Sequence, residues 1–395
     1  MSTDPRRPYL VVPKLIDQPT WGGQYIVENK GWTHHANLAN AKIGQSYELF
    51  SGSNLSLLDS SENPAFVGEF TDRDAVQMQT DLPNAISLDE LIDANSAKAI
   101  LGAEVVAARG PRLELLIKFT QALGNSFQVH IKAGVKDPVW KPKPESWYFF
   151  EPGLITLGVK PDADWAAYEE AVTAVEHAMT EIGRQIAAGE LAYEDAQPKV
   201  QALLKEHDPW QYVNLVRTAK DELIDLSGGG LHHSWEEDPK APLGNVLYEL
   251  QAEAMDDIST FRNFDKGKVG QHGEIRDLHI SEYYKHIDRD PAANDPASHV
   301  VKARAIAHTD TYRLDRLLET PLYNLDKLSF SHSGATFTED PGRYKHLFVK
   351  TGKITVMAGS HTITVGTGHS GFVPAAAGEY EVTCLAGPAE VLISF

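Results

Sequence analysis

Short strand-like segments recur at even spacing near the C-terminus, and few folds accommodate such a pattern. Five of them lie within the last 70 residues, at 345–350, 353–357, 361–365, 379–385 and 390–395. Turn residues separate the segments every ~8–12 residues, which is typical of an antiparallel sandwich or a small barrel. We therefore predict a barrel-like β unit here, with turns at Gly352–Ile354 and Gly371–Pro374.

One long amphipathic pattern interrupts the β-rich chain. Apolar residues recur at steps of three and four from Trp165 to Ile186, which predicts a helix that is capped by Asp162 or Asp164 and stopped by Gly189. A second helix is expected from about Glu194 to His207. Strand patterns return near residue 220, so residues 160–220 form a predicted helical insertion.

Shorter elements precede the insertion. Ser87 and Glu90 have the spacing of a capping box, which predicts the start of a helix. A further helix is expected from Ser96 to Ala108, and a buried strand from Leu113 to Phe119.

Composition excludes several classes of function. The 395 residues include 36 Lys and Arg against 55 Asp and Glu, a net charge of −19 that repels nucleic-acid backbones. The single cysteine, Cys384, excludes a disulfide framework. The N-terminus lacks a signal-peptide pattern, and no apolar run approaches the ~20 residues of a membrane span. We expect a cytoplasmic protein with neither a nucleic-acid nor a membrane partner.

Residues 124–132 carry the pattern that matters most for chemistry. The positions alternate as in a strand with one apolar face, which is formed by Phe127, Val129 and Ile131. Gln128 and His130 share the opposite face, about 7 Å apart. Glu145 follows in a loop, and His232 or His233 follows a glycine turn. Two imidazoles, a carboxylate and an amide suit zinc or another divalent ion, although each histidine alone also fits a surface or hydrogen-bonded residue.

Several segments, in their order along the chain, resemble one enzyme family. The main segments are Gln128–His130, Lys143–Tyr148, Gly230–His232, Tyr248–Gln251 and Thr260–Asp265. Supporting segments are Pro19–Gly23, Gly44–Glu48, Leu116–Phe119 and Gly273–His279. Together they resemble the type I mannose-6-phosphate isomerases, a family of zinc enzymes built from two cupin (jelly-roll β-barrel) domains.

The resemblance implies a ligand set for one zinc ion, or another divalent ion, per chain. The corresponding residues are Gln128, His130, Glu145 and His232, with His233 as the alternative to His232. The C-terminal barrel is expected to hold no metal. Its scattered histidines, which we expect at the surface, are His346, His361 and His369.

The resemblance also implies catalytic and substrate-binding residues. Glu249 corresponds to a candidate base for proton transfer between two sugar carbons, Lys143 to an oxyanion-stabilising group, and Arg262 to a phosphate or sugar ligand. Each also has a structural interpretation, namely a bonded strand carboxylate, a solvated loop lysine and a salt bridge. Substrate contacts are implied for Trp21, Ser46 and Lys268.

The sequence departs from the family pattern around the expected pocket. Ile131 follows His130 where the family has proline, and Gln45 replaces a family glutamate. These changes leave open an isomerase of another sugar, phosphorylated or free, or a non-catalytic sugar-binding sensor. An iron-dependent cupin oxygenase is disfavoured because such sites rarely use an amide ligand such as that of Gln128.

We therefore expect a mainly β protein with two cupin domains and a helical insertion. The expected divisions are residues 1–159 for the first part of the N-terminal cupin, 160–220 for the insertion, 221–300 for the completion of the metal-binding cupin, and 301–395 for the second cupin. The expected function is metal-dependent interconversion of mannose 6-phosphate and fructose 6-phosphate, with the sugar phosphate as partner and the oligomeric state open.

Overall fold

The computed structural model divides the chain into two compact units. It describes residues 3–18, 21–36, 38–57, 85–132, 134–231, 234–254, 258–340 and 342–395. Unit 1 comprises Met1–Gln121, Leu247–Glu253 and Val301–Phe395, and unit 2 comprises Ala122–Val246 and Ala254–Val300. The domain divisions that we expect from the sequence stay a prediction.

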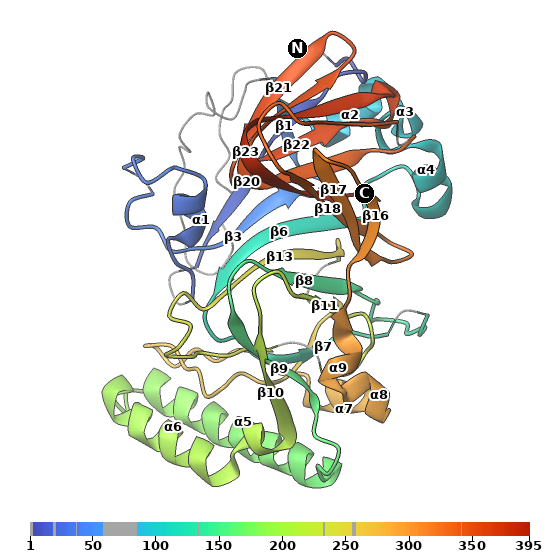
Figure 1. Ribbon diagram of the computed structural model, residues 1–395. Coiled ribbons are helices and arrows are strands. Elements are labelled where there is room, and N and C mark those ends of the chain that lie inside the picture. The colour runs from blue at the N-terminus through green and yellow to red at the C-terminus, as the bar shows by residue number, and fades with distance from the viewer. Residues whose placement is uncertain are drawn as a thin grey trace. The chain divides into compact units, whose positions relative to one another are not determined.

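A large antiparallel sheet dominates unit 1 (Figure 1). Its order is β16-β17-β18-β23-β20-β22-β1-β4-β5, with β19 on β23 and β21 on β20. The N-terminal strand β1 pairs with the C-terminal β22, so the two ends of the chain are joined in one sheet. The strands are β1 (Tyr9–Val12), β4 (Asn54–Ser56), β5 (Ala85–Ser87), β16 (Arg304–His308), β17 (Tyr312–Glu319), β18 (Asn324–Phe330), β19 (Thr336–Glu339), β20 (Lys345–Ala358), β21 (His361–Gly366), β22 (Ser370–Val373) and β23 (Tyr380–Ser394).

Unit 1 also contains the neighbouring strands β13-β6-β3-β2 and several short helices. These strands are β2 (Lys14–Asp17), β3 (Ile43–Leu49), β6 (Leu115–Ala122) and β13 (Asn245–Ala252). The helices are α1 (Tyr25–Asn29), α2 (Leu88–Ala94), α3 (Ala97–Leu101), α4 (Ala103–Arg109) and the 3₁₀ turn η4 (Ala375–Ala377). The predicted capping box of Ser87 and Glu90 begins α2. The helix expected over 96–108 is instead two helices, because Gly102 has a φ of +103° that no helix allows.

Two pairs of predicted strands are in fact single long strands. The segments near 345–350 and 353–357 form one strand, β20, and those near 379–385 and 390–395 form β23. Gly352, with φ +88°, lies at a shift of register between β20 and β23 and does not reverse the chain. The turn expected at Gly371–Pro374 is also wrong, since Gly371 lies within β22.

The expected surface position is wrong for two of the three C-terminal histidines. His346 is fully buried and His369 is 5% exposed, whereas His361 is partly exposed. His346 lies on β20 and His369 directly precedes β22, and burial lowers the pKa of each imidazole to about 3. Both rings are therefore neutral at pH 7.

Unit 2 combines small antiparallel sheets with the predicted helical insertion. Strand β9 pairs with β10 and β12, β8 pairs with β11, and β7 pairs with β14. The strands are β7 (Phe127–Val129), β8 (Glu145–Phe149), β9 (Gly153–Val159), β10 (Val213–Thr218), β11 (Leu223–Asp225), β12 (Ser234–Trp235) and β14 (Phe261–Phe264), and β15 (Val300–Val301) follows at the boundary with unit 1 along the chain. The helices are α5 (Trp165–Ala187), α6 (Tyr193–His207), η2 (Pro209–Tyr212), α7 (Ile280–His286), α8 (Pro291–Asn294) and α9 (Pro296–His299).

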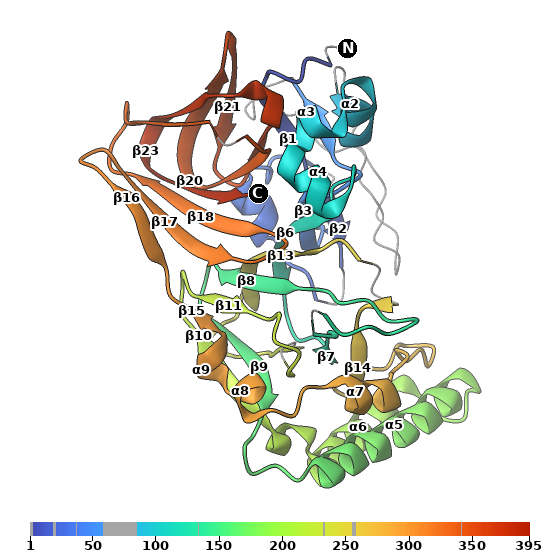
Figure 2. The ribbon, with the colours of Figure 1, turned by 90° about the vertical axis from the view of Figure 1, so that its right-hand side faces the viewer.

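The two helices of the predicted insertion lie close to their expected positions, whereas its last part, residues 213–218, forms strand β10 instead. Asp164 caps α5 by accepting hydrogen bonds from two backbone amides, and Gly189 follows its end with φ +70°. Helices α5 and α6 lie side by side in both ribbon views (Figures 1 and 2). None of the helices in the described part of the chain combines the length and apolarity that a membrane crossing requires.

The buried face of α5 packs against the strand that carries the candidate ligands. Phe127, Val129 and Ile131 share one apolar core with Val172 and Val175 of α5. The predicted apolar face of residues 124–132 is thus confirmed, although the regular strand β7 covers only Phe127–Val129. The polar face, with Gln128 and His130, points away from this core.

Candidate metal centre

Gln128 and His130 are both buried, with 7% and 2% of their surface exposed. The Gln128 amide nitrogen donates to the Ser126 hydroxyl at 3.0 Å, which turns the amide oxygen away from Ser126. His130 Nδ1 lies 2.8 Å from the Ser259 carbonyl oxygen. Because a carbonyl only accepts, Nδ1 carries the proton and Nε2 keeps its lone pair. This is the arrangement by which proteins orient a metal-binding histidine.

Glu145 begins β8 and is fully buried. One carboxylate oxygen accepts a hydrogen bond of 2.7 Å from the Trp147 indole nitrogen. The other, Oε2, lies 3.2 Å from His130 Nε2. The two side chains therefore point at each other, that of His130 from the residue after β7 and that of Glu145 from the start of β8.

The facing atoms of His130 and Glu145 need a positive charge between or beside them. Both are electron-pair donors when Nδ1 carries the imidazole proton, so a second proton or a cation must offset their repulsion. Among the described residues, no three His, Cys, Asp or Glu side chains gather at one point. The described donors are one imidazole, one carboxylate and the Gln128 amide, a mixed N/O set that fits a first-row divalent cation.

Lys143 and Arg262 place positive charge beside this set. The Lys143 ammonium is 5% exposed and lies 3.6 Å from Glu145 Oε2. Arg262 on β14 is the direct cross-strand partner of Gln128. Cross-strand partners project to the same face of a sheet, so the guanidinium leaves β14 on the ligand side. The structure thus groups five of the predicted site residues within unit 2.

The predicted fourth ligand, His232, and its alternative His233 lie outside the described residues. The glycine turn before them is described. A Cβ on Gly229 would come within 2.9 Å of Lys132 Cβ, and one on Gly230 within 2.0 Å of the Ala293 carbonyl oxygen. Only glycine allows this close packing, which brings the turn beside Lys132, two residues after His130.

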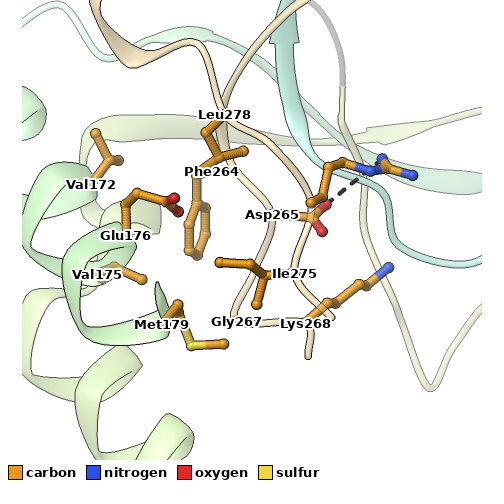
Figure 3. A pocket seen from close by; sticks show the side chains of 11 residues that line it. Val172, Val175, Glu176, Met179, Phe264, Asp265, Gly267, Lys268, Ile275 and Leu278 are labelled. Carbon is orange, nitrogen blue, oxygen red and sulfur yellow. Dashed lines mark ion pairs between the residues drawn. The ribbon is translucent and has the colours of Figure 1, made fainter. Parts of the chain in front are cut away.

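Lys268 lies in the loop after β14, at a small pocket against α5 (Figure 3). Apolar side chains of α5 and the loop form most of the pocket wall, and Asp265 pairs with Arg276 at 3.8 Å. The Lys268 ammonium donates to the Gly124 carbonyl oxygen at 2.6 Å, and burial of this group lowers its pKa. Its neighbour Lys266 pairs with Glu236 at 2.8 Å, and burial lowers the Lys266 pKa to about 8.

Among known proteins, similar ones are found only by comparison with solved structures. No protein-family model and no curated protein sequence matches the chain. The mannose 6-phosphate isomerase from Bacillus subtilis matches with a TM-score of 0.64 and 14% identity, over 98% of this chain and 99% of that one. A zinc-bound mannose 6-phosphate isomerase matches with a TM-score of 0.61 and 14% identity, over 98% and 99%. A mutant phosphomannose isomerase from Salmonella typhimurium matches with 0.61 and 13%, over 98% and 99%.

The chain has the fold of the mannose 6-phosphate isomerases. The expected fold class, mainly β with two cupin units and a helical insertion, is thereby confirmed. At this identity the likeness concerns the fold, so the roles of individual residues rest on the geometry of this chain.

Trp21 and Ser46, for which the sequence resemblance implies substrate contacts, lie in unit 1. The Trp21 ring packs on the backbone of β3, where a Cβ on Gly44 would come within 2.4 Å of it. Ser46 is fully buried and donates to Glu48 at 2.6 Å. Glu48 also pairs with the buried Lys30 at 2.7 Å. Substrate binding by Trp21 and Ser46 stays a prediction.

Glu249 lies on β13 in unit 1 and is 2% exposed. It pairs with the Lys118 ammonium at 2.7 Å and accepts from the Thr120 hydroxyl at 3.3 Å. Lys118 was not among the site residues predicted from the sequence. Its signal was a lysine within the otherwise apolar run Leu115–Phe119, a position that lysine rarely takes without an acidic partner.

Proposed function

We propose that the protein is a metal-dependent aldose–ketose isomerase that interconverts mannose 6-phosphate and fructose 6-phosphate. One observation carries this proposal: the buried His130 presents its Nε2 lone pair to the Glu145 carboxylate at 3.2 Å, in a chain with the fold of the mannose 6-phosphate isomerases. A buried imidazole and carboxylate in this arrangement are donors that a divalent cation can bind. Structures of this fold include a zinc-bound one, and we take zinc as the metal.

Gln128, His130 and Glu145 would hold the ion, with His232 as the proposed fourth ligand. When bound, a divalent cation polarises a substrate oxygen and so acidifies the neighbouring C–H bond. Hydrogen bonds within the chain already orient two of these side chains, His130 and Glu145. Ser259 fixes the His130 tautomer, and Trp147 holds the Glu145 carboxylate.

Lys143 would stabilise the charge that develops on the substrate oxygen. Its ammonium is buried beside Glu145, and a fixed charge is most effective where water is excluded. Arg262 would bind the phosphate, because its planar fork matches phosphate oxygens in a bidentate way. Lys268 offers a single point charge as a further proposed contact.

Glu249 is our proposed base for proton transfer between C1 and C2. A base must be ionised before it accepts a proton, and the Lys118 ammonium at 2.7 Å favours the ionised carboxylate. The base takes a proton from one carbon and returns it to the other, so no net proton is consumed.

The test combines metal analysis with an isomerase assay. Purified protein is assayed with mannose 6-phosphate and with free mannose, with zinc and after treatment with a chelator. We expect bound zinc, turnover of the phosphorylated sugar and loss of turnover with chelator. The His130→Ala variant should lose the zinc and more than about 100-fold of kcat/KM, since even outer-sphere changes cost ~10–100-fold.

His177→Ala is the matched control, since His177 lies exposed on α5 in the same unit. This variant should keep its zinc and its activity. Turnover that survives in zinc-free protein would refute the mechanism. Zinc binding without turnover of either sugar would refute the proposed reaction but would still support the metal centre.

A further inference from the structure

The segment that carries Gln128 and His130, strand β7 and the residue after it, has little regular support of its own. Strand β7 is three residues long and pairs only with β14 in a two-stranded sheet among the described residues. Two short strands alone are marginally stable in water. A ligand geometry that must hold to about 0.5 Å therefore requires further anchors.

One such anchor is Asn125, three residues before Gln128. Its backbone N–H donates to the Trp235 carbonyl oxygen at 3.1 Å, and its side-chain oxygen accepts from the Trp235 N–H at 2.6 Å. The amide oxygen thus replaces a backbone carbonyl, and Asn125 pairs with Trp235 as a strand residue would. The opposite edge of β12 pairs with β9, with Trp235 opposite Ile155.

The Trp235 side chain reaches the second ligand strand. Its indole ring lies 5.3 Å from that of Trp147, centroid to centroid, at an interplanar angle of 39°. Trp147 in turn donates to Glu145. Trp235 is 4% exposed, so its ring is fixed by its surroundings.

A third contact holds the Trp235 backbone in place. The Lys266 ammonium donates to the Trp235 carbonyl oxygen and pairs with Glu236. Glu236 also accepts from the Trp210 indole at 3.2 Å. The Trp235 backbone thus binds Asn125, two residues before β7, its ring contacts β8, and its neighbour Glu236 ties β12 to the loop after β14 and to η2.

We propose that Asn125 and Trp235 are positioning residues that set the separation between Gln128 and His130 on one strand and Glu145 on the other. Asn125 acts on the first strand through the backbone of Trp235, and the Trp235 ring acts on the second through Trp147. This inference rests on the proposed metal centre, and it assigns to β12 a role in metal affinity that lies outside the ligand set.

The test compares Asn125→Leu with Asn125→Asp in the full-length protein. Leucine keeps the side-chain shape and removes the acceptor, whereas aspartate retains an acceptor for the Trp235 N–H. Zinc affinity is measured by competition with a chromophoric chelator and is corrected for the folded fraction. We expect Asn125→Leu to bind zinc roughly 10–100-fold more weakly and Asn125→Asp to remain within about threefold of the wild type.

Asn214→Leu is the matched control for stability. Asn214 also bonds through its side chain to backbone carbonyls of unit 2, and these carbonyls, of Leu157 and Asn294, belong to neither β7 nor β8. The Asn214→Leu variant should lose stability and keep its zinc affinity. If Asn125→Leu does not fold, Trp235→Phe supplies the second arm: it keeps the backbone bonds, shrinks the ring on Trp147, and should weaken zinc binding severalfold.

The outcomes separate this inference from the proposed function. Zinc binding by Asn125→Leu that equals the wild type would overturn the positioning role and leave the metal centre intact. An equal loss in Asn214→Leu would overturn it as well, because general destabilisation would then explain the effect. A wild-type protein that binds no zinc would instead refute the metal centre itself.

Discussion

Acidification should destabilise unit 1 through its buried histidines, and His369 allows the effect to be calculated. The ring is 5% exposed, packs edge-on against Trp32, and places Nε2 3.2 Å from the Lys30 carbonyl oxygen. Burial, together with the positive charge of Lys30, lowers the imidazole pKa from an ordinary 6.5 to about 3. The unfolded chain therefore binds a proton between pH 6.5 and 3 that the folded chain does not bind.

The sign and size of the effect follow from proton linkage. Where the unfolded state binds more protons, stability rises with pH. The contribution of the buried His369 is therefore fully present above pH 6.5 and is lost as the pH falls toward 3. At pH 5 the unfolded histidine lies about 1.5 pH units below its pKa, which corresponds to a loss of about 2 kcal/mol at ~1.4 kcal/mol per unit. His346, whose pKa is also about 3, should contribute a similar loss.

The assay is equilibrium urea unfolding at pH 7 and pH 5, followed by circular dichroism. Carboxylates also titrate in this range, so the quantity that matters is the difference between the wild type and His369→Phe. Phenylalanine keeps the ring beside Trp32 and removes the titrating group. Between pH 7 and pH 5 the free energy of unfolding should fall by about 2 kcal/mol less in this variant than in the wild type.

His308→Phe is the matched control, since His308 is exposed on β16 of the same unit. This variant tests whether the loss of any histidine, and not of a buried one, changes the pH dependence. If His369→Phe shows the wild-type dependence as well, the reasoning from burial is refuted.

Two further predictions concern unit 2. Trp147→Phe keeps the ring and removes the donor to Glu145, so zinc affinity should fall roughly 10–100-fold in a chelator competition; an unchanged affinity would exclude an orienting role for the indole. Burial lowers the Lys266 pKa to about 8, so the unfolded chain binds more protons between pH 8 and 10.5 and stability should rise there. Between pH 7 and 9 the free energy of unfolding of the wild type, measured in urea, should rise by about 1 kcal/mol more than that of Lys266→Met. An equal change in both proteins would contradict this.

The local parts of the fold were accessible from the sequence. Helix α5 begins at the predicted cap, Asp164, and buries the predicted apolar face, because both signals act within a few residues. The apolar alternation of residues 124–132 likewise identified the face that carries Gln128 and His130. The order of the short motifs along the chain led to a fold that the comparison confirms.

Elements that depend on distant partners were predicted less well. Gly352 reads as a turn in the sequence, yet β23 pairs with β20 on both sides of it and holds the chain as one strand. His369 reads as a scattered surface histidine, yet its Nε2 bonds to Lys30, 339 positions away in the chain. No local pattern encodes such contacts, since only the folded chain brings these residues together.

The sequence by itself placed the candidate ligands Gln128 and His130 on one face, because strand alternation sets which side chains share a face, and the family resemblance added Glu145 and His232. Only the tertiary structure decided how those atoms are oriented. Ser259, which fixes the His130 tautomer, is 129 positions from it, and Trp235 is 110 positions from Asn125. Hydrogen bonds act over about 3 Å in space whatever the separation along the chain, so the orientation of the centre emerges only when the strands of unit 2 assemble.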